Sequence, residues 1–420
     1  MQRIKQVAAH LAGSRPGQGL AELERKRPDD VVITMAVRSP LCKAKKGGFK
    51  DVKTDELFLE MYKQAIVASR IDPAIIEDIC VGTVLTPTPV YPARTAAMAA
   101  GIPETVPVQV VNRFCSSGLM AVADIANKVR SGQIEIGLAI GIESMSDNPD
   151  DGGPPQSELV SCNSHSRDCN EKMGWTSENV AAEFNVTRDE QDQFAAESWQ
   201  RAERAQELGY FRNEIVPFTV YQKDPKTGEK RFVTVREDDG IRKGTTKEAL
   251  SKIRSAFPQW GNGTTTGGNA CQLTDGAAAV LIMTRRKAEQ LGLRIVAKYI
   301  TTAVTGLPPR IMGIGPVPAI RAALKNCGLT IADVDLFEIN EAFASQAVYS
   351  VKELNIPRDK VNVNGGAIAF GHPLGCTGAR QIATGLNELH RRKQRVLVTS
   401  MCIGTGMGAA GVFIGETPAN

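Results

Sequence analysis

The chain has 420 residues and a net charge of +4, with 42% hydrophobic and 23% charged residues. This length predicts two to three domains with sizeable apolar cores. The sequence has no basic stripe interleaved with aromatic residues, which argues against nucleic-acid binding, and no apolar run approaches the roughly 18 residues of a transmembrane segment.

Residues 1–29 are predicted to be a leader that precedes the first strand. Arg3, Val7, His10 and Leu11 would share one face of an amphipathic helix. A leader without a targeting role and a mitochondrial transit peptide both fit this acid-poor pattern. Residues 3–11, RIKQVAAHL, also resemble the amino-terminal peroxisomal targeting nonapeptide. We expect a peroxisomal protein whose partners include an import receptor, with mitochondrial import as the alternative.

Strand-like and helix-like segments alternate after the leader, which is typical of an α/β fold. A first series has strands at 30–37, 79–84, 108–111, 136–146 and 274–283, with helices at 55–69 and after residue 115. A second series runs from the strand at 295–304 through a helix at 319–327 to the strand pair at 395–415. We predict two similar α/β halves, at 30–146 with 263–293 and at 294–420. Chance similarity of segments rich in small residues is the alternative.

Residues 147–262 differ from both halves and are predicted to be an inserted loop domain. The stretch SDNPDDGGPPQSEL is rich in turn residues, and Thr187 with Glu190 forms a capping-box pattern at a helix start. Two strand-like runs, 214–221 and 230–235, flank the turn DPKTGEK. Because insertions on a rigid scaffold often carry function, we expect substrate contacts here.

Cys115 stands between the strand at 108–111 and a helical pattern, followed by Ser116, Ser117 and Gly118. Free N–H groups and the dipole at a helix start favour a thiolate, so Cys115 is a candidate nucleophile. A buried, inert small residue is the equal alternative. The chain has nine cysteines and no CxxC pair, which argues against a disulfide framework or a zinc site.

His372 is the best candidate for a general base among only four histidines. It lies in the glycine-dense stretch GGAIAFGHPLGCTGAR, which leads into a helix that Cys376 opens. Cys376 is interpreted as structural. The alternative for His372 is a satisfied core histidine.

Two further segments place polar groups directly after strands. Cys402 ends one strand and is followed by Gly404, Gly406 and Gly408, but no helix or acidic partner follows, so a dinucleotide site is excluded. An exposed amide at Gly404 suits an oxyanion. Asn340, in EINEAF, either caps a helix or positions a water or an oxyanion.

The motifs NRFCSSG, NEAF, GGAIAFGHPLGCTGAR and CIGTGMG occur in this order and together resemble the thiolase family. The resemblance covers nearly the whole chain from about residue 30. It implies two similar βαβαβαββ halves in a five-layered α-β-α-β-α core with an inserted loop domain. It also implies an acyltransferase that cleaves 3-ketoacyl-CoA with coenzyme A in fatty acid β-oxidation. The expected protein is a homodimer with acyl-CoA substrates, no metal and no permanently bound cofactor.

The same resemblance implies roles for individual residues. Cys115 would carry the acyl group, His372 would activate it, and Cys402 would be the acid and base at the acetyl-CoA methyl carbon. Asn340, through a water, would form one oxyanion hole with His372. The backbone amides of Cys115 and Gly404 would form the other.

Several positions bear on substrate binding, and some depart from the family pattern. Phe114 stands where Gln is usual. Cys271 stands where a Ser that binds pantetheine is usual, and its thiol is a weaker donor. Arg242 matches an arginine near the CoA adenine, Ala249 replaces a Ser, and Phe343 closes the NEAF motif.

Three other functions remain as alternatives. An acetoacetyl-CoA-forming thiolase would use the same residues for condensation. A condensing ketoacyl synthase typically uses one Cys and two His, whereas here Cys402 takes the second histidine's position. A non-catalytic acyl-CoA or lipid carrier would lack Cys115, His372 or Cys402, and all three are present.

Overall fold

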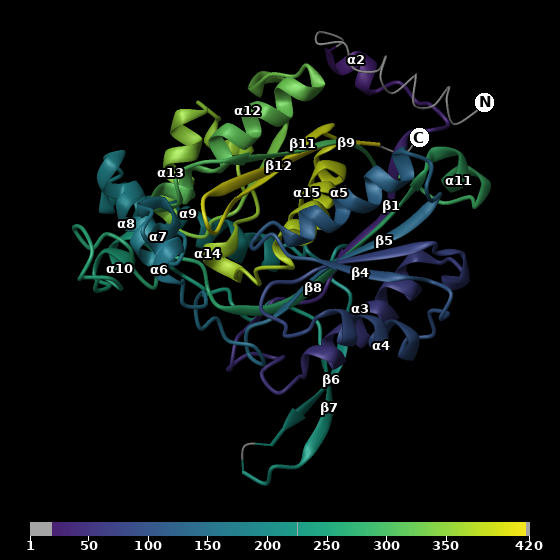
Figure 1. Cartoon of the computed structure of the whole chain (residues 1–420), viewed down its shortest axis with the longest axis horizontal. Coiled ribbons are helices and arrows are strands. Elements are labelled where there is room, and N and C mark those ends of the chain that lie inside the picture. Colours follow the sequence, from purple (N-terminus) through teal and green to yellow (C-terminus); the bar gives the residue numbers. More distant parts are fainter. Residues whose placement is uncertain (1–18, 225, 417–420) are drawn as a thin grey trace.

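The computed structural model describes residues 19–224 and 226–416 (Figure 1). The predicted targeting signal at 3–11 lies outside these residues. The described chain begins with the short helix α2 (Gly19–Leu23). Within the described ranges, no helix is both long and apolar enough to cross a membrane.

The first half of the chain contributes strands and helices on either side of the insertion. They are β1 (Val31–Arg38), β2 (Cys42–Lys43), α3 (Thr54–Ser69), β3 (Asp78–Gly82), α4 (Val90–Ala99), β4 (Val108–Val111), α5 (Ser117–Arg130), β5 (Ile136–Ser144), β8 (Thr274–Thr284) and α11 (Arg285–Gln290). The second half contributes β9 (Ala297–Gly306), α12 (Pro316–Cys327), β10 (Leu336–Ile339), α13 (Ala344–Glu353), α14 (Ala367–Phe370), α15 (Thr377–Arg392), β11 (Val396–Ile403) and β12 (Met407–Gly415).

The two halves share one strand order, to which the first half adds β4 at its edge. The ten-stranded sheet runs β10-β11-β12-β9-β1-β8-β5-β3-β4, with β2 on β8. In the first half β3 is parallel to β4 and β5, and β8 is antiparallel to β5 and β1. In the second half β10 is parallel to β11, and β12 is antiparallel to β11 and β9. A short antiparallel contact joins the two halves where Val32 and Ile33 of β1 meet Lys298 and Ala297 of β9. This arrangement agrees with the predicted fold of two similar halves.

Helices cover both sides of each half-sheet and complete the predicted five layers. α5 and α15 pack against each other between the two half-sheets, and both contact β5 and β8. α3 and α4 form one outer layer, against β1, β8 and β4, while α12, with α13 beside it, forms the other, against β9 and β12 (Figure 1). β5 and β8 are buried along their whole length, which explains their nearly continuous apolar sequence.

The central helices approach each other closely through two glycines. A Cβ atom added to Gly378 of α15 would lie 2.2 Å from the backbone nitrogen of Leu119, and one on Gly118 of α5 would lie 2.6 Å from the carbonyl oxygen of Gly375. Only glycine permits such contacts. The starts of α5 and α15 therefore meet directly, and these starts carry Cys115 and the His372 loop.

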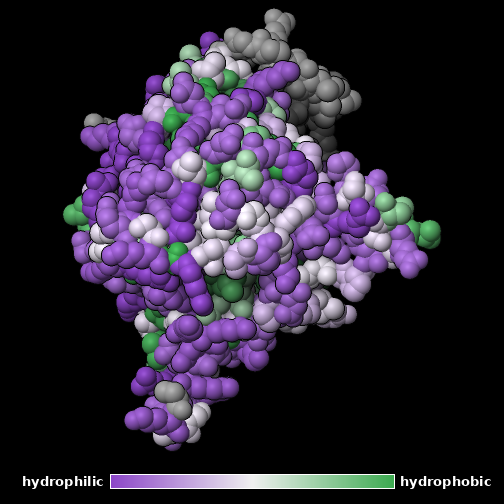
Figure 2. Space-filling view, turned by 90° about the vertical axis from the view of Figure 1, so that its left-hand side faces the viewer, coloured by the Kyte–Doolittle hydropathy of each residue, from purple (hydrophilic) through white to green (hydrophobic). Residues whose placement is uncertain are grey.

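The inserted segment forms a separate group of helices and a protruding hairpin. It contains α6 (Glu158–Ser161), α7 (Ser164–Asp168), α8 (Met173–Glu183), α9 (Arg188–Glu207), β6 (Phe218–Lys223), β7 (Lys230–Val235) and α10 (Lys247–Ser251). The capping box of Thr187 and Glu190 at the start of α9 is confirmed. The face that carries these helices is mostly hydrophilic, with apolar residues near its middle (Figure 2). The limits of this segment at 147 and 262 remain a prediction.

Candidate active site

Cys115 lies in the turn between β4 and α5, as predicted. The helix begins at Ser117, whose hydroxyl accepts from the Arg113 N–H at 2.9 Å and donates to the Phe114 carbonyl at 2.7 Å. Phe114 adopts a left-handed backbone conformation, with a φ of 44°. These contacts tighten the turn and hold Cys115 just before the helix start.

The thiol of Cys115 is buried, and burial raises its pKa to about 12. The backbone N–H groups of Gly404 and of Cys115 itself face the sulfur and partly oppose this rise in pKa. The helix start was expected to favour a thiolate, but desolvation of the side chain outweighs it. Cys115 is therefore a neutral thiol that needs a base, and the two amides already point at its sulfur.

His372 lies between α14 and α15 and is held at both ring nitrogens. Its Nδ1 is 2.6 Å from the hydroxyl of Thr377, which itself donates to the Pro373 carbonyl at 3.2 Å. Because that hydroxyl proton is used, Nδ1 carries the ring proton and Nε2 is the acceptor. Burial, with the charge of Arg380, lowers the pKa of His372 to about 3. The side chain is thus a neutral imidazole whose Nε2 lone pair faces the Nδ2 group of Asn340.

Asn340 follows β10 and contacts His372 directly. Its Nδ2 lies 3.3 Å from Nε2 of His372. The N-cap of α13 is Phe343, so Asn340 does not cap that helix and this alternative is wrong. Oδ1 of Asn340 is buried and has no partner among the described residues. A buried acceptor of this kind is suited to hold a water.

Cys402 lies near the end of β11 in an apolar cluster. Met312 and Ala342 pack against it, and Met173, Cys271 and Phe343 line the same cluster. Its Sγ lies 3.1 Å from Oε1 of Gln346. Burial raises the pKa of Cys402 far above its usual range, and the nearby Cys115 adds to this rise. Cys402 is therefore also a protonated thiol.

A chain of hydrogen bonds connects these groups. Cys402 contacts Gln346, whose Nε2 donates to the Asn340 carbonyl at 3.1 Å, and Asn340 contacts His372. Cys115 joins the group through the amide of Gly404 and its proximity to Cys402. Within the described ranges no hydrogen bond joins Cys115 to His372, which is common for catalytic pairs without substrate.

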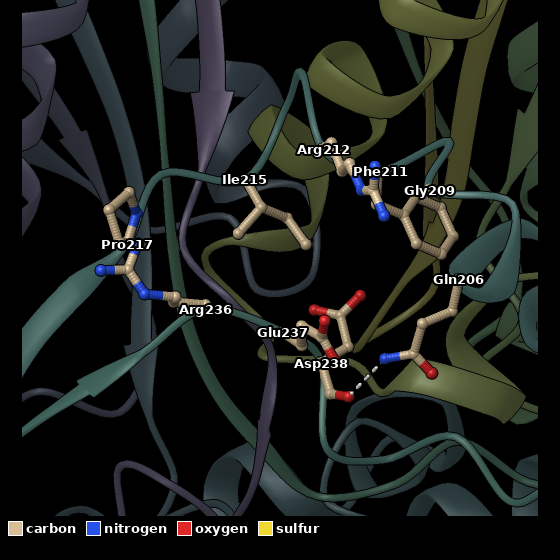
Figure 3. A pocket seen from close by; sticks show the side chains of 9 residues that line it. All are labelled: Gln206, Gly209, Phe211, Arg212, Ile215, Pro217, Arg236, Glu237 and Asp238. Atoms are coloured by element: carbon tan, nitrogen blue, oxygen red, sulfur yellow. Dashed lines mark hydrogen bonds between the residues drawn. The ribbon is translucent and has the colours of Figure 1, made fainter.

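A surface pocket near the base of the β6–β7 hairpin is a separate feature. Its volume is about 230 Å³, and Figure 3 shows its lining residues: Gln206, Gly209, Phe211, Arg212, Ile215, Pro217, Arg236, Glu237 and Asp238. Gln206 donates to the Asp238 carbonyl there, and the Asp238 carboxylate pairs with the buried Arg38. None of the predicted site residues lines this pocket.

Comparison with known proteins decides the family. The family described as Thiolase, N-terminal domain matches residues 31–286, and Thiolase, C-terminal domain matches residues 293–415. The chain belongs to the thiolase family. It is 50% identical to the peroxisomal 3-ketoacyl-CoA thiolase of Yarrowia lipolytica, over 99% of this chain and 100% of that protein.

Solved structures of thiolases share the fold. The dimeric peroxisomal thiolase of Saccharomyces cerevisiae has a TM-score of 0.88 and 47% identity, covering 94% of this chain and 100% of that one. Human mitochondrial 3-ketoacyl-CoA thiolase in complex with CoA has a TM-score of 0.81 and 34% identity, covering 92% and 98%. The thiolase fold predicted from the sequence is confirmed.

Two of the three departures of this thiolase from the family pattern, Phe114 and Cys271, lie at the site. The Phe114 ring packs beside Gly404: a Cβ on that glycine would lie 3.5 Å from Cγ of Phe114. The Phe114 side chain is 39% exposed. Cys271 and Phe343 lie in the cluster around Cys402, where burial raises the pKa of Cys271 to about 12. Both cysteine neighbours of Cys115 in this thiolase are thus protonated.

The residues expected at the CoA adenine lie on the inserted segment. The guanidinium of Arg242 lies 5.3 Å from the ring centroid of Trp199, which is fully buried. Ala249 lies in α10, and its N–H is capped by the Thr246 hydroxyl. Neither residue belongs to the cluster around Cys402. Their role toward CoA remains a prediction.

Three polar residues of this thiolase site were missed from the sequence. Thr377 sets the tautomer of His372, and Gln346 contacts Cys402. Glu143, within the apolar strand β5, accepts hydrogen bonds from Thr83 and from backbone N–H groups that include that of Gly375. A lone carboxylate in an apolar strand was the available signal for Glu143. Burial raises its pKa to about 7, and its contacts join the His372 loop to the segment after β3.

Proposed function

We propose that this thiolase is a 3-ketoacyl-CoA thiolase, which cleaves 3-ketoacyl-CoA with CoA into acetyl-CoA and a shortened acyl-CoA. The observation that carries the proposal is the pair of buried thiols, Cys115 and Cys402, with the neutral base His372 tied to Cys402 through Asn340 and Gln346. The names of relatives that are 50% identical over the full length support the same activity.

The first half-reaction acylates Cys115. Nε2 of His372 takes the thiol proton, and the sulfur attacks the ketone carbon of the substrate. The resulting oxyanion is on the carbon bonded to Cys115 and faces the amides of Cys115 and Gly404. The protonated His372 and a water held by Asn340 stabilise the enolate oxygen of the departing acetyl-CoA, and each donor contributes about 3 kcal/mol. The bond between the α and β carbons then breaks, and Cys402 gives its proton to the departing acetyl-CoA carbanion.

The second half-reaction transfers the acyl group to CoA. The protonated His372 passes its proton to the Cys402 thiolate, and the neutral imidazole then takes the proton of the CoA thiol as the CoA sulfur attacks the thioester on Cys115. The amides of Cys115 and Gly404, which face the Cys115 sulfur, are suited to hold this second oxyanion. Collapse releases the shortened acyl-CoA, and His372 returns its proton to Cys115. Coenzyme A is thus a co-substrate, and no step uses a metal or a permanently bound cofactor.

The surroundings of Cys402 suit an acyl chain. Met173, Met312 and Phe343 form an apolar wall beside the reacting sulfur. Methionine side chains adapt to substrates of different shape. Arg242 and the inserted segment are proposed to bind the nucleotide part of CoA.

A homodimer is proposed through β4. This strand ends the sheet order, and its four residues are only partly buried. An edge strand of this kind is a template for pairing with another chain. A second copy paired by two-fold symmetry would cover it. The dimeric yeast thiolase supports this assembly. By the names of its relatives and the pattern at 3–11, we place the enzyme in the peroxisome, with an import receptor as partner.

Relative rates on two substrates test the proposed function. We expect kcat/KM for thiolysis of 3-ketodecanoyl-CoA to exceed that of acetoacetyl-CoA, because the apolar wall binds the longer chain. Release of acetyl-CoA, followed spectrophotometrically at equal enzyme concentration, measures both. A higher value on acetoacetyl-CoA would favour the acetoacetyl-CoA-forming alternative. Binding of both substrates without cleavage of either would favour a carrier.

A further inference from the structure

Gln346 is a buried amide that bridges two parts of the site. It lies in the first turn of α13 and is 1% exposed. Its Nε2 donates to the Asn340 carbonyl at 3.1 Å, and its Oε1 lies 3.1 Å from Sγ of Cys402. A Cβ atom added to Gly313 would lie 3.1 Å from the Cβ of Gln346, so this glycine packs closely against the stem of the side chain. Both ends and the stem of this side chain are therefore held.

These contacts determine which atom of Gln346 faces the thiol. Only the NH₂ group can donate to the Asn340 carbonyl, so the carbonyl oxygen Oε1 must face Cys402. The Cys402 S–H is then the donor of the second bond. A fixed acceptor beside the sulfur orients the S–H proton of Cys402. The remaining sulfur lone pairs point away from Gln346.

We infer that Gln346 is a positioning residue for the proton transfer at Cys402, and this inference rests on the proposed function. In thiolysis the S–H bond of Cys402 breaks and a C–H bond of the acetyl-CoA methyl group forms. In the reverse direction the thiolate takes that methyl proton and the new S–H bond is held by Oε1. Gln346 fixes the sulfur in both directions without touching the substrate.

The inference predicts a selective defect. Transfer of an acetyl group from acetyl-CoA to Cys115 and back to another CoA uses His372 and Cys115 but moves no carbon-bound proton. Exchange of the acetyl-CoA methyl protons with solvent needs Cys402. Loss of Gln346 should therefore slow methyl-proton exchange while leaving acyl exchange nearly intact.

The Gln346→Met variant keeps the side-chain length and removes both hydrogen bonds. We expect deuterium uptake into the methyl group of acetyl-CoA in D₂O, followed by NMR, to fall about ten-fold or more. Exchange of isotopically labelled CoA into acetyl-CoA should stay within about three-fold of the wild-type rate. Equal losses in the two reactions would overturn the inference.

Gln381 provides a matched control. It is a buried glutamine on α15 that donates to the carbonyls of Glu338 in β10 and Ser400 in β11. These are the strands that precede Asn340 and carry Cys402, but Gln381 has no hydrogen bond to a thiol among the described residues. Gln381→Met should change the two reactions by the same factor. If Gln381→Met shows the same selective loss of methyl-proton exchange, the loss results from general disturbance of β10 and β11, and Gln346 has no special role.

A second variant keeps the inference testable if Gln346→Met does not fold. Gln346→Glu retains an acceptor and adds negative charge beside Cys402, so the pH profile of methyl-proton exchange should shift upward. An unshifted profile contradicts the inference. If the wild-type protein performs neither exchange reaction, the proposed function is wrong. If it performs both and the variants show no selective loss, only the inference about Gln346 is wrong.

Discussion

Replacement of His372 by alanine is expected to lower kcat/KM for thiolysis by about four orders of magnitude or more. The variant loses the base that accepts the Cys115 proton, worth about 10² to 10⁴, and also a donor to the oxyanion. At neutral pH the Cys115 thiol has a pKa of about 12 and ionises very little without a base. Both thiolysis and acyl exchange should be lost, whereas the Gln346 variant should lose mainly proton exchange.

His390 supplies the control for this experiment. It lies on the same helix, α15, and its Nε2 is buried without a partner among the described residues. His390→Ala should keep kcat/KM within a few-fold of wild type. A His372→Ala enzyme that is folded by circular dichroism and retains more than about a hundredth of wild-type activity would show that another group is the base.

Gly378→Ala is expected to lower the free energy of unfolding by about 3 kcal/mol or more, or to prevent folding. Its new Cβ would lie 2.2 Å from the Leu119 nitrogen, so α5 and α15 would have to separate in the central layer. Overpacking against backbone has no side-chain rearrangement to relieve it. Urea unfolding followed by fluorescence measures the change.

Gly306→Ala is the matched control for that substitution. A Cβ at Gly306 would meet no heavy atom within 4 Å. Its unfolding midpoint should therefore stay near that of the wild type. A Gly378→Ala variant with the same unfolding midpoint as the wild type would mean that α5 and α15 are not in close contact.

The sequence predicted most of the fold because hydrophobic period and capping are local signals. The strand at 108–111 and the capping box at Thr187 agree with the structure. Boundaries differ where tertiary contacts decide them. The strand predicted at 79–84 ends at Gly82, because the N–H groups of Val84 and Leu85 bind Glu143 instead of a neighbouring strand. The strand predicted from 214 begins at Phe218, directly after Pro217, which lacks a ladder donor.

The site could be predicted as residue types but not as protonation states. The motifs singled out Cys115, His372, Asn340 and Cys402, and the structure brings these residues together. The neutral state of both thiols could not be predicted, since it depends on burial between the half-sheets. Gln346 was missed because its hydrogen-bond partner Cys402 lies 56 residues further along the chain. Only the packing of α13 beside the end of β11 brings the two side chains together.

Covalent acylation of Cys115 is the central step of the proposed reaction. Mass spectrometry of the protein after addition of 3-ketodecanoyl-CoA, with free CoA excluded, tests this point. We predict one acyl group per chain, two carbons shorter than the substrate acyl group, on the peptide that contains Cys115. The same group found on Cys271, Cys402 or any other residue, or no adduct in an enzyme active with CoA, would contradict the account.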